Sequence, residues 1–370
     1  MIRVFKPSYD NRELEAVAEV MRSGWVGLGP KTAEFEQAFA SFCGVEYCVG
    51  LNSGTAAINM ALSLLGIGKG DEVIIPTITF VSAAHCIISH GAEPVFADVN
   101  QDTLNMDLTD MQSKITSKTR AIMPVHFGGL PVRMDELITL AEEIPVIEDC
   151  AHAAGTRYKG QHVGGMGDVG CFSFHAVKNI AMGEGGAVIL KNKSLAERAK
   201  KRRWLGIDRE TWDRTSLDRS YWWEYSVTEI GVKAHMDDIH AAIGLVQLEK
   251  LEEANDRRRK ITHLYRQGLR DINQLEMPPE ETDDIQSSWH IFHVKAEKRD
   301  ELNLYLNSMG ISTGVHYKPL HLYACYGRQP SLPVAEDIFK RILTLPLYPD
   351  LTDKEVSYVT DTIRKFYHAL

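Results

Sequence analysis

The chain alternates short apolar runs with amphipathic stretches from about residue 45 onward. Several runs are rich in valine and isoleucine and apolar on successive residues, which is typical of parallel strands covered on both faces. They predict strands at Glu46–Leu51, Glu72–Pro76, Pro94–Ala97, Arg120–Val125, Pro145–Glu148, Val169–Phe174 and Ala187–Leu190. The stretches between them predict helices at Thr55–Leu65, Val81–Ser89, Met134–Glu142 and Leu195–Arg203. This order indicates an α/β fold with a mostly parallel central sheet and helices on both faces.

The pattern changes near Met236. A long helix is expected from Asp237 to about Leu269, because apolar residues recur there near helical spacing, and the basic run Arg257–Lys260 is expected on its solvated face. After it we expect strands at Trp289–Lys295 and Ile311–Val315 and helices at Val334–Leu343 and Asp353–Tyr367. The sequence therefore predicts an N-terminal arm and large α/β domain at 1–245, and a smaller C-terminal α+β domain at 246–370.

Composition and charge narrow the class of protein. A chain of 370 residues is about right for two domains. Its net charge of -9, from 50 acidic and 41 basic residues, argues against a general nucleic-acid-binding surface. No apolar run approaches the ~20 residues of a membrane span, and the N-terminus has no signal-peptide core. We expect a cytoplasmic protein with no nucleic-acid or membrane partner and, since no cysteines form a CxxC pair, no metal site.

Three separate segments carry groups that suit one cofactor. Lys178 follows a short apolar run and precedes the glycine-rich turn Gly183–Gly186. Asp149 ends an apolar strand, where active sites of open α/β sheets gather, and Ser53-Gly54-Thr55 stands where a strand runs into a helix. The start of a helix attracts anions. A lysine, a strand-end acid and a phosphate-type turn are the parts needed to hold pyridoxal 5'-phosphate as a Schiff base.

Each of these residues also fits a simpler interpretation. A lysine beside a glycine-rich turn is usually solvated, and Ser53–Thr55 would serve as an ordinary helix cap. Asp149 would equally form a cap or a structural salt bridge. Phe80 could stack on a flat ring or belong to the core, and Ser173 could reach a phosphate or simply close a turn. The aromatic cluster at 221–225 fits a core or a subunit interface better than a ligand surface.

Several motifs, taken in order, resemble the sugar aminotransferases of the DegT/DnrJ/EryC1/StrS family. They are SGTAA, DEVIIPTITFVSA, GAEPVFADV, VIEDCAHAAG, GDVGCFSFHAVKNIAMGEGGAV and MDDIHAAIGLVQL, and the resemblance extends from Gly24–Pro30 to Leu345–Leu347. It implies a fold-type-I pyridoxal-phosphate transferase. Lys178 then matches the lysine that forms the Schiff base and moves the proton, and Asp149 matches the acid that faces the pyridine nitrogen.

The resemblance also implies roles for the other residues that hold the cofactor. Ser53, Gly54, Thr55 and Ser173 match the phosphate cradle, and Phe80 matches the aromatic residue that stacks on the ring. Two positions differ from the commonest pattern. His152 stands where a glutamine usually approaches the phenolic oxygen, and an imidazole can donate the same hydrogen bond. Lys233 stands where many members carry an asparagine that reaches the phosphate from the partner subunit, which implies a homodimer with a shared active site.

By the same resemblance, the expected reaction is a ping-pong transfer of an amino group, with L-glutamate as donor, to a nucleotide-linked 3- or 4-keto sugar. The product would serve amino-sugar biosynthesis for lipopolysaccharide, other cell-surface glycans or secondary metabolites. A keto derivative of a sugar acid, such as an octulosonate, is an alternative acceptor. A sugar dehydratase, which the intact Lys178 disfavours, and a non-catalytic cofactor-binding regulator are further alternatives.

The sequence offers few candidates for contact with the substrate. They are Trp25, His316, Tyr317 and His321, the last three in one loop that could also be a structural turn. Arg202 and Arg203 could meet a diphosphate or carboxylate, or lie at a solvated helix end.

Overall fold

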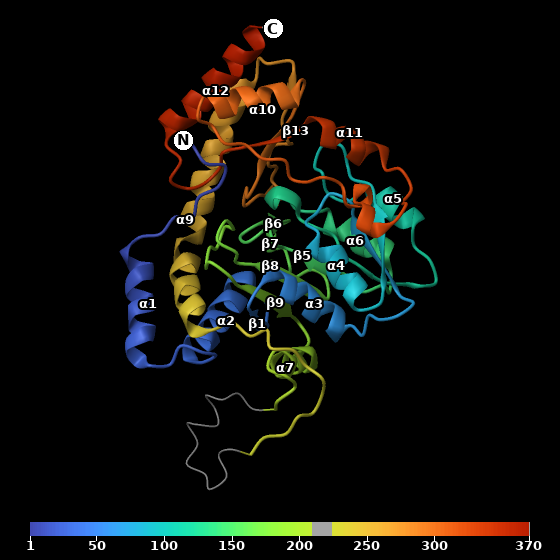
Figure 1. Cartoon of the computed structure of the whole chain (residues 1–370). Helices are drawn as coiled ribbons and strands as arrows, with labels where there is room; N and C mark the ends of the chain where they lie inside the picture. Colours follow the sequence, from blue (N-terminus) through green and yellow to red (C-terminus); the bar gives the residue numbers. More distant parts are fainter. Residues whose placement is uncertain (209–223, 370) are drawn as a thin grey trace.

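The computed structural model describes residues 1–208 and 224–369, and a central sheet runs through its larger part (Figure 1). The sheet strands are β1 (Tyr47–Leu51), β2 (Glu72–Pro76), β3 (Glu93–Ala97), β4 (Thr119–Ile122), β5 (Ile147–Asp149), β8 (Val169–Ser173) and β9 (Gly186–Leu190). They lie in the orders β1-β9-β8-β5 and β3-β2-β4, and single bridges join Ile122 to Val146 and Val125 to Asp149. β5 pairs with β8, and β2 with β3 and β4, in parallel, whereas β9 runs antiparallel to both neighbours. The predicted, mostly parallel α/β sheet is confirmed.

Helices cover both faces of this sheet. They are α2 (Pro30–Cys43), α3 (Gly54–Leu64), α4 (Ser82–Ser89), α5 (Leu108–Ser113), α6 (Met134–Ala141) and α7 (Lys193–Arg202), with the 3-10 turn η1 (Phe127–Gly129). The first helix, α1 (Asn11–Ser23), packs instead against the long helix α9 (Asp238–Leu269). Residues of α3, α4 and α7 share one apolar core cluster with the sheet, and residues of α2, α5 and α6 share another. Two such clusters explain why successive strand residues are apolar, because each face of the sheet buries its own set.

A smaller unit caps one end of the molecule (Figure 1). It contains the sheet β10-β12-β13 and helices α10 and α12 around a third apolar cluster. Its elements are β10 (Leu275–Glu276), β12 (Phe292–Ala296), α10 (Arg299–Ser308), η2 (Leu320–Leu322), η3 (Ala324–Tyr326), α11 (Pro333–Arg341), β13 (Ile342–Leu345) and α12 (Asp353–His368). Three short strands, β6 (Arg157–Tyr158), β7 (Gln161–His162) and β11 (Ile285–Gln286), form a separate small sheet.

Helix α9 (Asp238–Leu269) connects the two units, as the sequence predicts. Its first half packs in the second core cluster through Ala241 and Leu251, and its second half packs in the third through Ile261 and Tyr265. The expected domain boundary at 245/246 falls inside this helix, and it stays a prediction.

Several predictions for the C-terminal unit and the basic run are wrong. Ile311–Val315 is not a strand: Ile311 and Gly314 form single bridges to Ile2 and Thr344, because the N-terminal segment pairs there. The helix predicted to end at Leu343 ends at Arg341, and the apolar residues after it form β13 against β12. Arg258 is buried rather than solvated. No helix in the described ranges is long and apolar enough to cross a membrane.

Candidate active site

A cavity of about 410 Å³ opens where β5 and β8 end and α3 begins. Ten predicted site residues line it: Ser53, Gly54, Thr55, Phe80, Asp149, His152, Ser173, Lys178, His316 and Tyr317. They come from segments far apart in the chain. Eight of them lie at or after the carboxyl ends of strands of the central sheet, and His316 and Tyr317 come from a loop before η2 (Leu320–Leu322). This is the cavity in which the predicted residues meet.

Half-buried Lys178 and buried Asp149 are the charged pair of this cavity. Burial lowers the pKa of Lys178 to about 8, and the opposing effect of the Asp149 charge is smaller. Burial also raises the pKa of Asp149, while the Ala151 N–H, 3.0 Å from its Oδ1, and Lys178 act in the opposite direction. Within the described residues, Oδ2 of Asp149 accepts no hydrogen bond, so one carboxylate oxygen is left for a ligand inside the cavity.

The strand that ends in Asp149 is fixed by its neighbour Glu148. The buried Glu148 carboxylate accepts hydrogen bonds from the backbone N–H groups of Gly164, Met166 and Gly167 at 2.6 to 2.8 Å, and it lies 3.1 Å from His126 Nε2. Burial alone would raise the pKa of Glu148, but the bond to His126 and these N–H groups hold it below its usual value. Glu148 therefore acts as a structural anchor, which holds Asp149 in place.

His152 and Tyr317 form a hydrogen-bonded wall. The Gly128 N–H lies 3.4 Å from His152 Nδ1, and the Tyr317 hydroxyl lies 3.2 Å from His152 Nε2. Burial lowers the pKa of His152 well below its usual value and raises that of Tyr317. Both side chains are therefore neutral near pH 7, and each can act as a hydrogen-bond donor.

The start of helix α3 lies against the end of β8. The Ser53 hydroxyl accepts a hydrogen bond from the Ala56 N–H at 3.0 Å, so it caps the helix, as the simpler interpretation expects. A Cβ atom at Gly54 would lie 2.7 Å from the Cβ of Ser173, so only glycine fits there without displacing Ser173. Within the described residues, the N–H groups of Gly54 and Thr55 make no hydrogen bond and remain available to an anion.

Phe80 lines the cavity with 57% of its surface exposed, and its ring lies 6.0 Å from that of Tyr317. An exposed aromatic ring at the edge of a cavity is free to stack on a planar ligand, which the core interpretation of Phe80 does not explain.

Three predicted residues do not line the cavity in one chain. The Trp25 indole donates a hydrogen bond to the Leu28 carbonyl at 3.0 Å, and the Lys233 ammonium lies over the Trp204 ring. His321 lies 2.7 Å from the Thr77 hydroxyl and 3.3 Å from Glu336, so it joins the loop of the smaller unit to the end of β2.

Arg202 and Arg203 at the end of α7 were expected either to bind a substrate anion or to lie in solvent, and neither interpretation fits Arg203. Its side chain is buried and forms an ion pair with Glu36, while Arg202 pairs with Glu229. Of the aromatic cluster, residues 221–223 lie outside the described residues, whereas Tyr225 is exposed.

The cavity also contains Phe5 and His290, which the sequence did not indicate. The Phe5 ring stacks on His290 at 5.1 Å between centroids and meets His316 edge-on at 5.4 Å. His290 is buried and lies 4.7 Å from the His152 ring, and burial lowers its pKa well below the usual value. Phe5 carries no local signal, because the N-terminal segment reaches the cavity only by pairing with the smaller unit at Ile2 and Val4.

Residues 7–364 match the DegT/DnrJ/EryC1/StrS aminotransferase family. The chain belongs to this family. It is 37% identical to a spore coat polysaccharide biosynthesis protein, SpsC, of Bacillus subtilis, over 97% of this chain and 95% of that protein. The part of the chain that matches the family therefore begins just after Phe5 and ends in helix α12. It includes every residue that was predicted to bind the cofactor.

Solved structures agree with this assignment. The aminotransferase TlmJ from Streptoalloteichus hindustanus is 38% identical, with a TM-score of 0.94, and the match covers 100% of this chain and 99% of that one. The sugar aminotransferase Spr1654 from Streptococcus pneumoniae, in its PMP form, is 32% identical with a TM-score of 0.94 over 100% of both chains. The same protein is also known in a PLP form. This member of the family is a sugar aminotransferase with the fold of pyridoxal-phosphate enzymes, and pyridoxal 5'-phosphate is its cofactor.

The cavity fits this cofactor on its own geometry. It offers a half-buried lysine of lowered pKa, a buried carboxylate with one oxygen left over, and two helix-start N–H groups beside a glycine that leaves room next to Ser173. These groups suit, in turn, an aldehyde, a pyridine nitrogen and a phosphate. An open face of the Phe80 ring completes a site for a flat anionic ring.

Proposed function

We propose that this sugar aminotransferase transfers the amino group of L-glutamate to a nucleotide-linked 3- or 4-keto sugar by a ping-pong mechanism in the cytoplasm, with Lys178 as the covalent and proton-transferring residue. The observation that carries the proposal is the position of Lys178, half-buried in the wall of the cavity with a pKa of about 8 and within reach of the charge on Asp149. When bound, the cofactor supplies an aldehyde that holds the amino group and a ring that accepts electrons from the adjacent carbon.

The residues of the chain divide the work between them. At pH 7.5 a lysine of pKa about 8 is neutral in roughly one molecule in four, against about one in a thousand for an ordinary lysine, so the Nζ of Lys178 can attack a carbonyl and later accept a proton. The free Oδ2 of Asp149 is placed to keep a ring nitrogen protonated. The neutral His152 donates from Nε2, and the start of α3 with Ser173 holds the phosphate.

The product is proposed to serve cell-surface glycans, including lipopolysaccharide, or secondary metabolites, and the names of two relatives support a role in glycan or amino-sugar biosynthesis. One is named for spore coat polysaccharide biosynthesis, and PseC of Helicobacter pylori, 27% identical with a TM-score of 0.92, is described as an aminotransferase of pseudoaminic acid biosynthesis. The neutral His290, His316 and Tyr317 suit sugar hydroxyls, since burial lowers the pKa of both imidazoles. They give less support to the carboxylate of an octulosonate.

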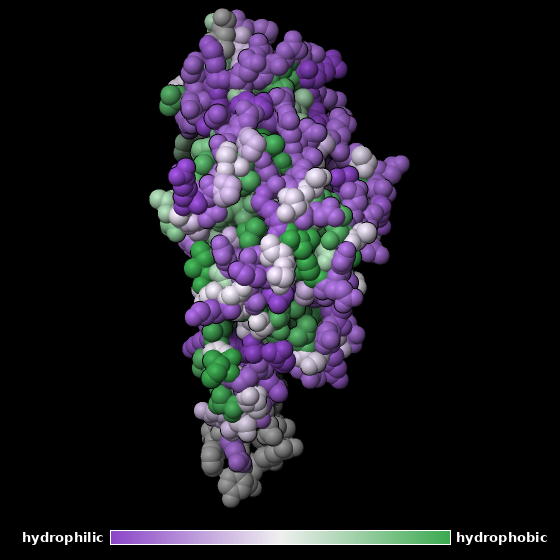
Figure 2. Space-filling view, turned by 90° about the vertical axis from the view of Figure 1, so that its right-hand side faces the viewer, coloured by the Kyte–Doolittle hydropathy of each residue, from purple (hydrophilic) through white to green (hydrophobic). Residues whose placement is uncertain are grey.

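We further propose that the active site is shared in a homodimer, with Lys233 of one chain reaching the cofactor phosphate of the other. Among the described residues, no arginine lines the cavity, although two anionic substrates must bind there. Lys233 lies on the segment that also exposes Leu205, Val227, Ile230 and Val232. Figure 2 shows hydrophobic residues on the surface of this narrow end of the molecule, which suits burial against a second copy.

Loss of Lys178 tests the reaction. Lys178→Ala is expected to lower the rate of amino transfer by about 10²–10⁴-fold or more and to abolish the glutamate-driven change in the visible spectrum of the loaded protein. Mass spectrometry of a panel of keto-sugars, with 3-keto, 4-keto and octulosonate acceptors, identifies the product. Lys193→Ala, on the exposed start of α7, is the control and keeps full activity. Wild-type turnover by Lys178→Ala, or a keto product without amine, would contradict the proposal.

Mixing two inactive variants tests the shared site. Lys178→Ala and Lys233→Ala are each defective, but in a mixed dimer one of the two sites contains both native lysines. Equal mixing followed by subunit exchange should therefore restore about a quarter of the wild-type activity. No gain over the separate variants, in a mixture shown by native mass spectrometry to contain mixed dimers, would refute sharing through Lys233.

A further inference from the structure

Lys178 also lines a second, much smaller cavity, of about 40 Å³, between the N-terminal segment and helix α9. Ser8 lies on one side of it, and Gln247, Lys250 and Arg258 of α9 lie on the other. Lys178 therefore separates this small cavity from the active-site cavity, since it contributes to the walls of both.

Arg258 is the unusual group in this wall. Its side chain is only 5% exposed, yet within the described residues it makes one hydrogen bond, from Nη1 to Asn255 Oδ1 at 3.3 Å, and no ion pair. A guanidinium has five N–H donors, and a buried charge without a counter-charge is costly. Burial lowers the pKa of Arg258 to about 10, against a smaller opposing effect of the Asp350 charge, so Arg258 remains a cation at neutral pH. Arg258 is thus a buried cation with unused hydrogen-bond donors in the wall of the small cavity, and this arrangement is typical of an anion-binding site.

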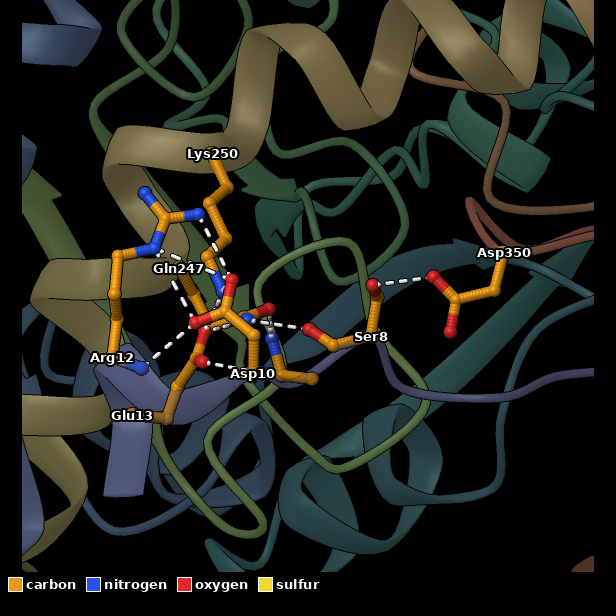
Figure 3. Close-up of polar contacts among 8 residues, drawn as sticks. Ser8, Asp10, Arg12, Glu13, Gln247, Lys250 and Asp350 are labelled. Atoms are coloured by element: carbon orange, nitrogen blue, oxygen red, sulfur yellow. Dashed lines mark hydrogen bonds and ion pairs between the residues drawn. The ribbon is translucent and has the colours of Figure 1, made fainter. Parts of the chain in front are cut away.

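The carboxylates nearby are already engaged by other groups (Figure 3). Asp350 accepts a hydrogen bond from the Ser8 hydroxyl at 2.6 Å and pairs with Lys6 at 3.1 Å. Lys250 pairs with Asp10 at 2.8 Å and with Glu13 at 2.6 Å.

The Gln247 amide N–H group donates to Glu13 and to the Ser8 carbonyl, which fastens the N-terminal segment over the cavity. Lys250 is thus neutralised by two carboxylates, whereas Arg258, beside Lys178 in the cavity wall, has no carboxylate in direct contact within the described residues and is influenced only at longer range by Asp350.

The volume limits what can bind. A water molecule needs roughly 10–15 Å³ of such space, so about 40 Å³ admits a halide ion or a carboxylate group but no sugar phosphate. We propose that this cavity binds a small monovalent anion, held by Arg258 next to Lys178. The anion is either a halide or the carboxylate of the amino donor. The donor carboxylate as ligand rests on the proposed function, because Lys178 would place the donor beside the cavity. A halide as ligand does not rest on it.

Bromide locates the site directly. Crystals of the cofactor-free protein soaked in sodium bromide should show an anomalous peak within about 4 Å of the Arg258 guanidinium. The peak should be lost in Arg258→Met and kept in Lys260→Met, which removes an exposed charge from the same helix. In solution, the Tm of the wild type should rise by about 2 °C for each tenfold increase in bromide above the Kd at constant ionic strength, and that of Arg258→Met should not.

Competition separates the two sources. If glutarate, a dicarboxylate without an amino group, removes the bromide peak, the site accepts the carboxylate of the donor; if the peak persists, the ligand is a halide. Water alone at Arg258, or a peak unchanged by Arg258→Met, would overturn the proposal. Should Arg258→Met fail to fold, the bromide peak beside Arg258 in the wild type is compared with the peak in Arg258→Lys. A peak that is unchanged in Arg258→Lys would then overturn the proposal. Absence of glutamate-driven amino transfer would refute the proposed function and leave the bromide peak unaffected.

Discussion

His152 has a defined hydrogen-bonding state, which supports the proposal that it replaces the glutamine of related sequences. Because the Gly128 N–H points to Nδ1, the proton of the neutral imidazole is on Nε2, the nitrogen that faces Tyr317 and the cavity. The side chain therefore presents one donor to a ligand, as an amide would. Burial prevents the ring from gaining a charge that a cationic cofactor ring would repel.

Replacement of His152 follows from this state. His152→Gln keeps a donor and is expected to retain activity within about threefold, whereas His152→Phe leaves the Gly128 N–H and Tyr317 hydroxyl without a partner and should cost about tenfold in kcat/KM. Steady-state kinetics with a fixed donor measures both. Equal losses in the two variants would show that ring shape, and not hydrogen bonding, is what His152 contributes.

At the level of elements, the proposed phosphate site lies where the start of α3 packs closely against the end of β8. Gly54→Ala is expected to weaken cofactor affinity about tenfold, because the new Cβ would lie 2.7 Å from that of Ser173 and one of the two elements must move. Titration of the cofactor-free protein measures the Kd. Gly68→Ala, where a Cβ meets nothing within 4 Å, is the control. Unchanged affinity in Gly54→Ala would exclude a phosphate at this junction.

The same elements show how far sequence alone reaches. The apolar runs were sufficient to predict the sheet and the place of Asp149 at a strand end, because local pattern and strand polarity determine both. His152, His316 and Tyr317 were predicted only from the resemblance to the family. Ile342 and Leu343, the first two residues of β13, were predicted to be helical because they continue the helical pattern of α11, whereas their pairing with β12 makes them a strand. Phe5 and His290 depend on how the N-terminal segment packs against a distant unit, which no local pattern encodes.

For the whole molecule, buried neutral histidines make stability sensitive to acid. Burial lowers the pKa of His162 to about 4 and of His293 to about 3, and that of His152 and His290 also falls. In the unfolded chain these groups have a pKa of about 6.5. The unfolded state then binds more protons below that pH, so stability is complete above about pH 6.5 and decreases as the pH falls towards 3.

His293 isolates this effect, because both of its ring nitrogens are buried without a hydrogen bond in the described structure. At pH 5 the difference in its pKa between the two states costs about 2 kcal/mol, which His293→Phe should restore, with a small gain in Tm at pH 7 as well. Thermal unfolding of the wild type and of His293→Phe from pH 4 to 8 measures this change in stability. His368→Phe, exposed near the end of α12, should keep the wild-type pH dependence. The same dependence in His293→Phe would rule out His293 as a source.

Helix α9 has a consequence for how this chain can be divided. At 1.5 Å per residue its 32 residues extend about 48 Å, from one apolar cluster into another. A cut at the expected boundary would leave each piece with part of a helix whose apolar face had lost its partner. The smaller unit therefore cannot be exchanged by itself. Recombination that moved it to another protein would have to include the whole of helix α9, because both units pack against this helix.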